Sequence, residues 1–215
     1  MLSERTSQRT VGIAGLVFVV LAVVGFGVLV GSVPGPGAEA DEIRDFLARS
    51  ELRVWAGGYV GLLSQLAFLV FAAGLWGVLR AAEGAPGWVS AAGLAAASAL
   101  VAATIAGDLV PGAAVFRGGD EIDPATAAVL LDAKKLAEIM LVPLLGFFMA
   151  SVAVVSLRTG VLPRWAGWGA ALVAVASVIL VPLGYETAQT PNFLALLWIV
   201  AISVRLLVRP APAPT

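Results

Sequence analysis

Charged side chains gather beside one apolar part of the chain, over residues 132–138. This group consists of Asp132, Lys134, Lys135 and Glu138, and its opposite charges are three residues apart (132/135 and 135/138) or four apart (134/138), so they can pair on neighbouring turns of a helix. Placing an ionisable group in or beside a membrane costs free energy, because the group loses water. A protein that retains such groups often uses them to bind an ion or a ligand. The chemistry open to this group is therefore either structural pairing along one helix or recognition of a charged ligand.

Two acidic residues elsewhere in the chain extend this group. Asp108 and Glu186 each lie at the end of an apolar stretch. Together with Lys135 and Glu138 they could form a charged vestibule that attracts a cation or a zwitterionic head group. The sequence leaves this vestibule open as an alternative to simple pairing.

The depth of these charges in a bilayer narrows the classes of function. Glu138 and Arg158 are 20 residues apart, about 30 Å at the helical rise, which equals the thickness of the hydrocarbon core. If Arg158 marks one boundary, Glu138 lies at the other, and the same arithmetic places Asp108 and Glu186 beside it. Every carboxylate and amine can then reach water or head groups, and no charge lies at the midplane, where proton pumps and many ion-coupled transporters carry one.

The deepest strongly polar side chain is Gln65. It lies about 16 Å below the outer start of its apolar stretch. Gln65 could bind a ligand, although an interhelical hydrogen bond to Ser98 or Thr104 is the simpler expectation. The candidate ligand-binding residues are Gln65, Asp108, Asp132, Lys135, Glu138 and Glu186.

Other chemistry is disfavoured by what the chain lacks. It contains no cysteine and no histidine, which removes thiol nucleophiles, imidazole acid–base catalysis and the usual zinc and haem ligands. Asp120, Glu121 and Asp123 could hold Ca²⁺, but their spacing does not match an EF-hand loop. We predict no metal and no cofactor, and no nucleic acid as a partner, because no basic aromatic stripe is present. These missing residue types argue against an enzyme, but the sequence alone leaves the question of catalysis open.

Apolar stretches long enough to cross a bilayer dominate the chain. Hydrophobic residues make up 60% of its 215 residues and charged residues only 13%. Lipid cannot hydrogen-bond a bare backbone, so each stretch must be helical. The sequence predicts an all-α, integral membrane six-helix bundle, a single domain over residues 1–215. The predicted spans are 11–31, 54–79, 87–109, 136–157, 165–183 and 191–208.

The segments between the spans carry further signals. Apolar residues at helical spacing over 39–54, with acids first and arginines later, predict a short amphipathic helix on the outer interface. This helix either leads into the second span or forms a lid over a cavity. Residues 111–121 are expected to be an irregular loop, after which Asp123 and Pro124 predict an N-cap and first helical residue. The alanine-rich span over 87–109 is expected inside the bundle, because small residues allow close packing.

The charges between the spans also predict an orientation. The amino-terminal tail, the second and fourth joints and the carboxy-terminal tail carry mostly arginine, whereas the other joints are rich in acids. Basic residues favour the cytoplasmic side, so both termini are expected there. The first apolar run is longer than that of a secretory signal, which favours a retained span.

Three segments of the chain are similar to segments of other small membrane proteins. They are the acidic stretch 38–55, the sequence Gly77-Val78-Leu79-Arg80, and residues 158–168 with their arginines, Gly160, Pro163 and tryptophans. The chain resembles uncharacterised small multi-span bacterial membrane proteins of a domain-of-unknown-function type, common in GC-rich bacteria. The resemblance implies six helices and a bacterial cytoplasmic (inner) membrane, and it brings no substrate or catalytic residue.

Two functional hypotheses remain at this stage. The first is a non-catalytic polytopic membrane protein that binds a lipid or other apolar small molecule between its helices, or acts as a partner subunit. Membrane lipids are its expected surroundings, with a homo-oligomer or a partner membrane protein as further options. The second is a small-molecule transporter with an outward-facing vestibule lined by Asp108, Lys135, Glu138 and Glu186.

Overall fold

The computed structural model describes residues 4–31, 33–35, 37–48, 51–116 and 123–208 and is helical throughout these ranges apart from short turns. Six helical segments are long and apolar enough to cross a membrane. The predicted all-α bundle of six membrane-spanning helices is therefore confirmed. The elements are α1 (Glu4–Ala22), continued by the π-helical segment η1 (Val23–Val30), α2 (Ala40–Ala48), α3 (Glu51–Glu83), α4 (Trp88–Phe116), α5 (Pro124–Thr159), α6 (Arg164–Ile179), the 3₁₀ turn η2 (Val181–Leu183), α7 (Tyr185–Ala188) and α8 (Thr190–Val208).

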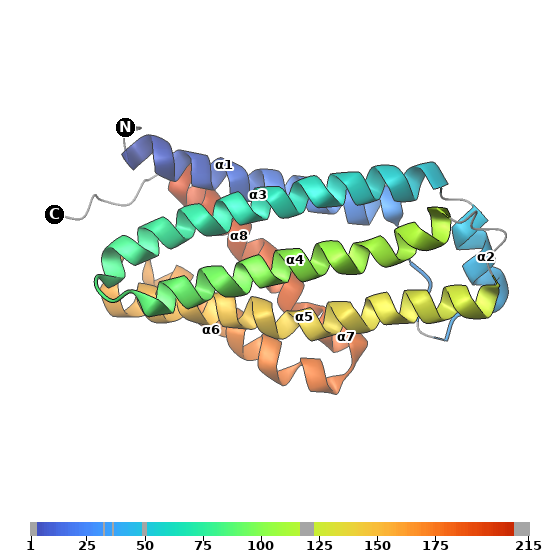
Figure 1. Ribbon diagram of the computed structural model, residues 1–215. Helices are drawn as coiled ribbons and strands as arrows, with labels where there is room; N and C mark the ends of the chain where they lie inside the picture. The colour runs from blue at the N-terminus through green and yellow to red at the C-terminus, as the bar shows by residue number, and fades with distance from the viewer. Residues whose placement is uncertain (1–3, 32, 36, 49–50, 117–122, 209–215) are drawn as a thin grey trace.

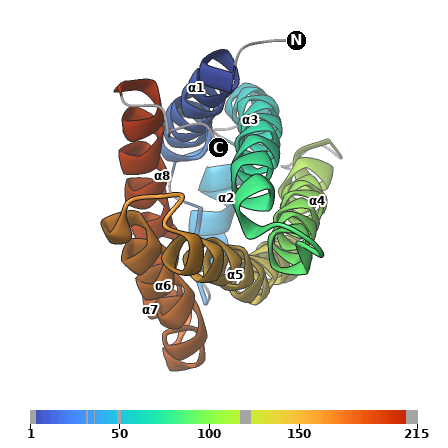
Figure 2. The ribbon, with the colours of Figure 1, turned by 90° about the vertical axis from the view of Figure 1, so that its left-hand side faces the viewer.

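The six long helices form a ring. Helix α1 packs against α3, α3 against α4, α4 against α5, α5 against α6, α6 against α8, and α8 returns to α1. Figure 2 shows this order along the bundle axis. The helix order could not be inferred from the sequence, because hydropathy identifies spans and not their neighbours.

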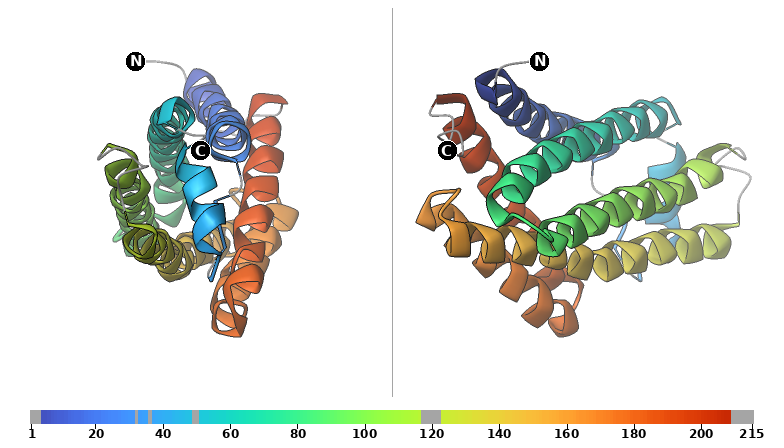
Figure 3. Two further views of the ribbon diagram at one scale, coloured as in Figure 1. Left: turned by 90° about the vertical axis from the view of Figure 1, so that its right-hand side faces the viewer. Right: turned by 60° about the vertical axis from the view of Figure 1, so that its left-hand side comes forward.

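The two ends of the ring differ in how they are covered. Helix α1 begins and α8 ends at one end, beside the α3–α4 and α5–α6 turns over 84–87 and 160–163 (Figure 1). We call this the closed end. At the opposite end, α2 packs on α5 and lies across the bundle (Figure 3). We call that the open end.

Local sequence explains the limits of the long helix α5. The carboxylate of Asp123 accepts a hydrogen bond from the backbone N–H of Thr126 at 3.2 Å, and Pro124 occupies the first turn, as predicted. The helix ends at Gly160, whose φ of 69° lies in the left-handed region that favours glycine, and whose N–H donates to the Ser156 carbonyl.

Two expectations about the segments were wrong. Helix α4 runs through Pro111 to Phe116, where a loop was expected; proline removes one N–H donor, which a membrane-type helix tolerates. Residues 117–122 lie outside the described ranges. The predicted short amphipathic helix outside the spans is confirmed as α2, although it ends before residue 54, since residues 51–54 already belong to α3. Helix α4 also does not lie inside the bundle: Ala95, Ala99 and Ala102 are exposed on its outward side.

Apolar residues fill the ring toward the closed end. Phe71, Leu75, Met149 and Ile202 are fully buried there. Close approach of α1 and α8 requires Gly12, where an added Cβ atom would lie 2.7 Å from the backbone oxygen of Ser203. This half of the bundle is therefore a tightly packed core.

Candidate functional site

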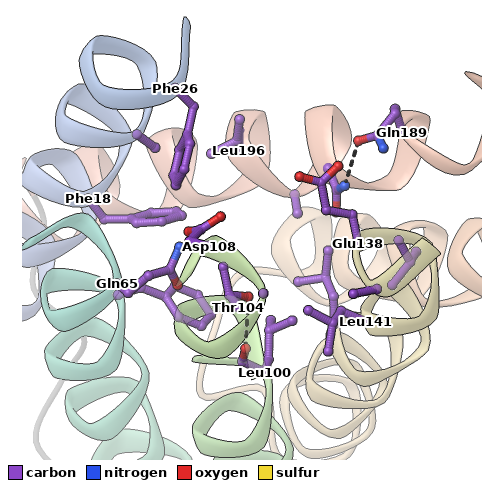
Figure 4. Close-up of a pocket in the computed structure, with 18 of the residues that line it drawn as sticks. Phe18, Phe26, Gln65, Leu100, Thr104, Asp108, Glu138, Leu141, Gln189 and Leu196 are labelled. Carbon is purple, nitrogen blue, oxygen red and sulfur yellow. Dashed lines mark hydrogen bonds between the residues drawn. The ribbon is translucent and has the colours of Figure 1, made fainter. Parts of the chain in front are cut away.

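A cavity of about 290 Å³ lies inside the ring toward the open end. Residues from α1, η1, α3, α4, α5 and α8 line it, so the ring arrangement itself creates the space. We call it the deep cavity. Its apolar lining includes Phe18, Phe26, Phe68, Leu100, Leu145 and Ile199. Figure 4 shows polar side chains from three of these helices pointing into it.

Three charged side chains line this cavity. The ammonium of Lys134 lies 3.2 Å from Asp108 Oδ1 and also hydrogen-bonds to Glu138 Oε1. The exposed fractions are 10% for the Lys134 side chain, 21% for Asp108 and 37% for Glu138. The spacing of four residues between Lys134 and Glu138 sets their pairing on α5, and Asp108 approaches from α4. We call Asp108, Lys134 and Glu138 the ion cluster.

The neighbouring Lys135 has a different role. Its ammonium donates hydrogen bonds to the backbone oxygens of Pro34 and Val33, the latter at 3.5 Å, and lies 5.3 Å from the centre of the Tyr185 ring. Lys135 therefore ties the segment before α2 to α5. Helix α2 is attached to α5 by a second contact, in which the buried side chains of Ile43 and Phe46 pack against Ala127 and Leu131.

A second cavity, of about 270 Å³, lies on the other side of the ion cluster. We call it the outer cavity. It shares Phe26 and the ion cluster with the deep cavity and adds Val33, Phe46, Lys135 and Tyr185 to its lining. The Tyr185 hydroxyl donates a long hydrogen bond, 3.5 Å, to Glu138 Oε2. The ion cluster therefore stands between the two cavities.

Gln65 lies deeper in the same space. It is only 9% exposed and lines the deep cavity, yet its amide makes no hydrogen bond to any other described residue. The expected partners are engaged elsewhere or face outward: Thr104 Oγ1 donates to the Leu100 carbonyl at 2.8 Å, and Ser98 is exposed. The simpler expectation of an interhelical bond was therefore wrong, and the Gln65 amide is directed to the cavity (Figure 4).

The structure brings together some of the residues proposed from sequence and separates others. Gln65, Asp108 and Glu138 line the deep cavity, and Lys135 lines the outer one. Asp132 and Glu186 are exposed and are absent from the described lining of both.

The burial of the lysines also differs from expectation. Lys134 is 8% exposed and Lys135 is 6% exposed, although water access was expected for every charged group. Carboxylates and backbone carbonyls replace water around these ammonium groups, which makes their burial tolerable.

Sequence reasoning did not assign the aromatic lining. Phe18 and Phe68 face each other across α1 and α3 with ring centres 5.0 Å apart, and Phe26 lines both cavities. A phenylalanine that lines a cavity looks the same in sequence as one in the core or in lipid. Gln189 and Asn192, which bond to each other at 3.0 Å and line the deep cavity, were also missed.

Within the described ranges, no group of three or more acidic residues is placed to hold a metal ion. Comparison of the chain with protein-family models, with curated proteins and with solved structures finds no match. The functional argument therefore depends on the geometry of the cavity.

Proposed function

We propose that this polytopic membrane protein binds a small apolar molecule with a polar end in the deep cavity. The observation that carries the proposal is a mostly apolar space inside the ring with the ion cluster in its lining. Ligand pockets are mostly apolar, with a few polar groups that fix orientation, and this cavity has that composition.

The size of the cavity limits the ligand. Its volume of about 290 Å³ is at the lower end of the roughly 300–1,000 Å³ range of small-molecule pockets. A compact molecule or a single short chain fits this space, whereas a complete two-chain lipid does not.

We also propose an orientation in a bacterial inner membrane with both termini in the cytoplasm. Arg80, Arg158, Arg164 and Arg205 all lie at the closed end, and basic residues favour the cytoplasmic side. The open end, with its two cavities, would then face outward.

Native mass spectrometry from mild detergent tests the binding proposal. Gly107 lines the deep cavity, and the nearest atom to an added Cβ there is 3.9 Å away, so Gly107→Leu would fill space without disrupting the backbone. We expect a co-purified small molecule on the wild type and its loss in Gly107→Leu. Gly77→Leu, at an exposed position of α3 with open space around it, is the matched control. Retention of the molecule by Gly107→Leu would contradict the proposal.

A transporter is the second candidate function. The observation that favours it is the position of the ion cluster between the outer and deep cavities, as expected for a path that is interrupted at one point. Flux into proteoliposomes tests it, with Glu138→Gln compared with the exposed Glu186→Gln. Flux that falls only in Glu138→Gln supports transport, and zero flux across a broad substrate panel argues against it.

A further inference from the structure

We infer that the ligand of the deep cavity is an organic cation: an apolar body that ends in an ammonium group held by Asp108 and Glu138. The inference rests on the proposed binding function and names the chemical class of the ligand. Four observations support it, and each concerns residues that line the cavity.

The first observation is charge. Two carboxylates and one ammonium line the deep cavity, so its lining carries one more negative group than positive groups, while the charge of Lys135 acts on Glu138 from the outer cavity. The other nearby cation, Lys135, is absent from the described lining and bonds to backbone carbonyls of the outer segment. A cation bound in the deep cavity would approach the two carboxylates from the side away from Lys135 and would be attracted by them.

The second observation is the unused acceptor capacity of the carboxylates. Lys134 contacts Asp108 through Oδ1 and Glu138 through Oε1. No described residue donates a hydrogen bond to Asp108 Oδ2, and Glu138 Oε2 receives only the long bond from Tyr185. Each carboxylate therefore retains an oxygen for a charge-assisted bond to an ammonium N–H.

The third observation is the aromatic lining beside these carboxylates. Phe18 and Phe26 line the deep cavity together with Asp108, and Figure 4 shows all three side chains in its lining. The faces of phenylalanine rings attract cations, and their apolar surface suits the body of the same molecule. One group of side chains can thus accept both parts of a cationic amphiphile.

The fourth observation is the unpartnered amide of Gln65. It is nine-tenths buried, lines the cavity and bonds to no described residue. Its amide atoms are accessible from the cavity, so a bound molecule can reach them. The carbonyl oxygen of Gln65 would supply an uncharged acceptor to the same ammonium.

A matched series of probes tests the inference. Phenylpropylamine, phenylpropanol and phenylpropanoate share one apolar body and differ in a cationic, neutral or anionic end. Binding to the full chain in uncharged maltoside detergent is measured by equilibrium dialysis, with empty micelles as the blank. We expect the amine to bind roughly tenfold more tightly than the alcohol, as for one added charge-assisted bond, and the carboxylate to bind most weakly.

Variants of the carboxylates locate the effect. Glu138→Gln and Asp108→Asn should each bring the affinity for the amine close to that for the alcohol. Asp132→Asn and Glu186→Gln remove exposed carboxylates of the same end and should leave the preference unchanged. If one cavity variant fails to fold, the other variant and the wild-type series still decide the question.

The outcomes separate the inference from the proposed function. Equal binding of the three probes, abolished by Gly107→Leu, overturns the cationic class and leaves cavity binding intact. Absence of binding by all three overturns both. Addition of a short, single-chain lysophosphatidylethanolamine distinguishes two sources of ammonium: competition with the amine identifies a lipid head group, and unchanged affinity identifies a free amine.

Discussion

The closed end and the open end of the ring are both lined mainly by apolar residues, but they differ in how completely side chains fill the interior. At the closed end, short turns join the helices and large side chains such as Phe71 and Ile202 are fully buried. At the open end, α2 covers the ring from outside, and the interior holds two cavities lined by four charged side chains. Close packing is therefore concentrated at one end, and unfilled, mostly apolar space with charged groups in its lining at the other.

The charged residues at the two ends also differ in the groups that they contact. At the closed end, Glu83 accepts hydrogen bonds from the backbone N–H groups of Val89 and Ser90, at 3.0 and 2.8 Å, within one local turn. At the open end, Lys134 joins carboxylates on two helices. Local capping leaves nothing free for a ligand, whereas the ion cluster retains acceptor oxygens. The contrast favours binding at the open end only.

The largest effect is expected from Lys134→Met, which removes the shared cation of the ion cluster. Two carboxylates would then face each other without compensation, and we expect a loss of about 2–3 kcal/mol in the free energy of unfolding. The loss should fall below the upper limit for buried pairs, because the Glu138 side chain is 37% exposed. Unfolding in mild detergent measures it.

A second substitution checks the cause. In Lys134→Met combined with Asp108→Asn, one of the two repelling charges is gone, so much of the lost stability should return. Equal stability of the single and double variants would show that Lys134 matters through its packing and not its charge.

The next effect contrasts two glycines, one at each end. Gly12→Ala should lower stability by about 1–2 kcal/mol, because the new Cβ atom would lie 2.7 Å from the Ser203 backbone oxygen and 2.9 Å from Leu207 Cγ. Gly107→Ala at the deep cavity meets nothing closer than 3.9 Å and should cause no loss. Thermal unfolding of both variants measures the difference, and equal losses would mean that the open end is as tightly packed as the closed end.

Much of the fold could be predicted because the bilayer imposes it. Span length, helical backbone and the Asp123 cap follow from local sequence and lipid chemistry. The packing of helices could not be predicted, because contacts between apolar helices depend on shape. The outward face of α4 illustrates this: alanine repeats permit close packing on any side and do not specify which side is used.

The site was only partly predictable, for a geometric reason. Residues four apart lie about 40° apart around a helix, so the pairing of Lys134 with Glu138 follows from sequence. Asp132 is six residues from Glu138 and therefore about 120° away, which is why it is exposed while Glu138 lines the cavities. The position of Glu186 depends on the turn at Gly184 and the short helix α7, which carry no clear periodicity.

A smaller effect is expected where α8 meets α6. The indole N–H of Trp198 donates to the Ala166 carbonyl at 2.8 Å, and Trp198 is 5% exposed. Trp198→Phe removes this bond and should cost about 1 kcal/mol. Trp168→Phe, at a position 67% exposed, is the control and should be neutral in unfolding experiments. A larger loss in Trp168→Phe would contradict the assignment of Trp198 as the interhelical contact.

The smallest effect is expected from Glu83→Gln at the closed end. The glutamine keeps one acceptor oxygen for the first turn of α4 but loses the charge that favours a helix N-terminus, so we expect a loss of about 0.5 kcal/mol. Hydrogen exchange at Val89 and Ser90 should rise, while exchange in α5 around Lys134 stays unchanged. Glu186→Gln, which alters an exposed carboxylate of the open end, should not affect these amides. Faster exchange around Lys134 in Glu83→Gln would mean that the two ends are coupled, and the division between a structural and a binding end would no longer hold.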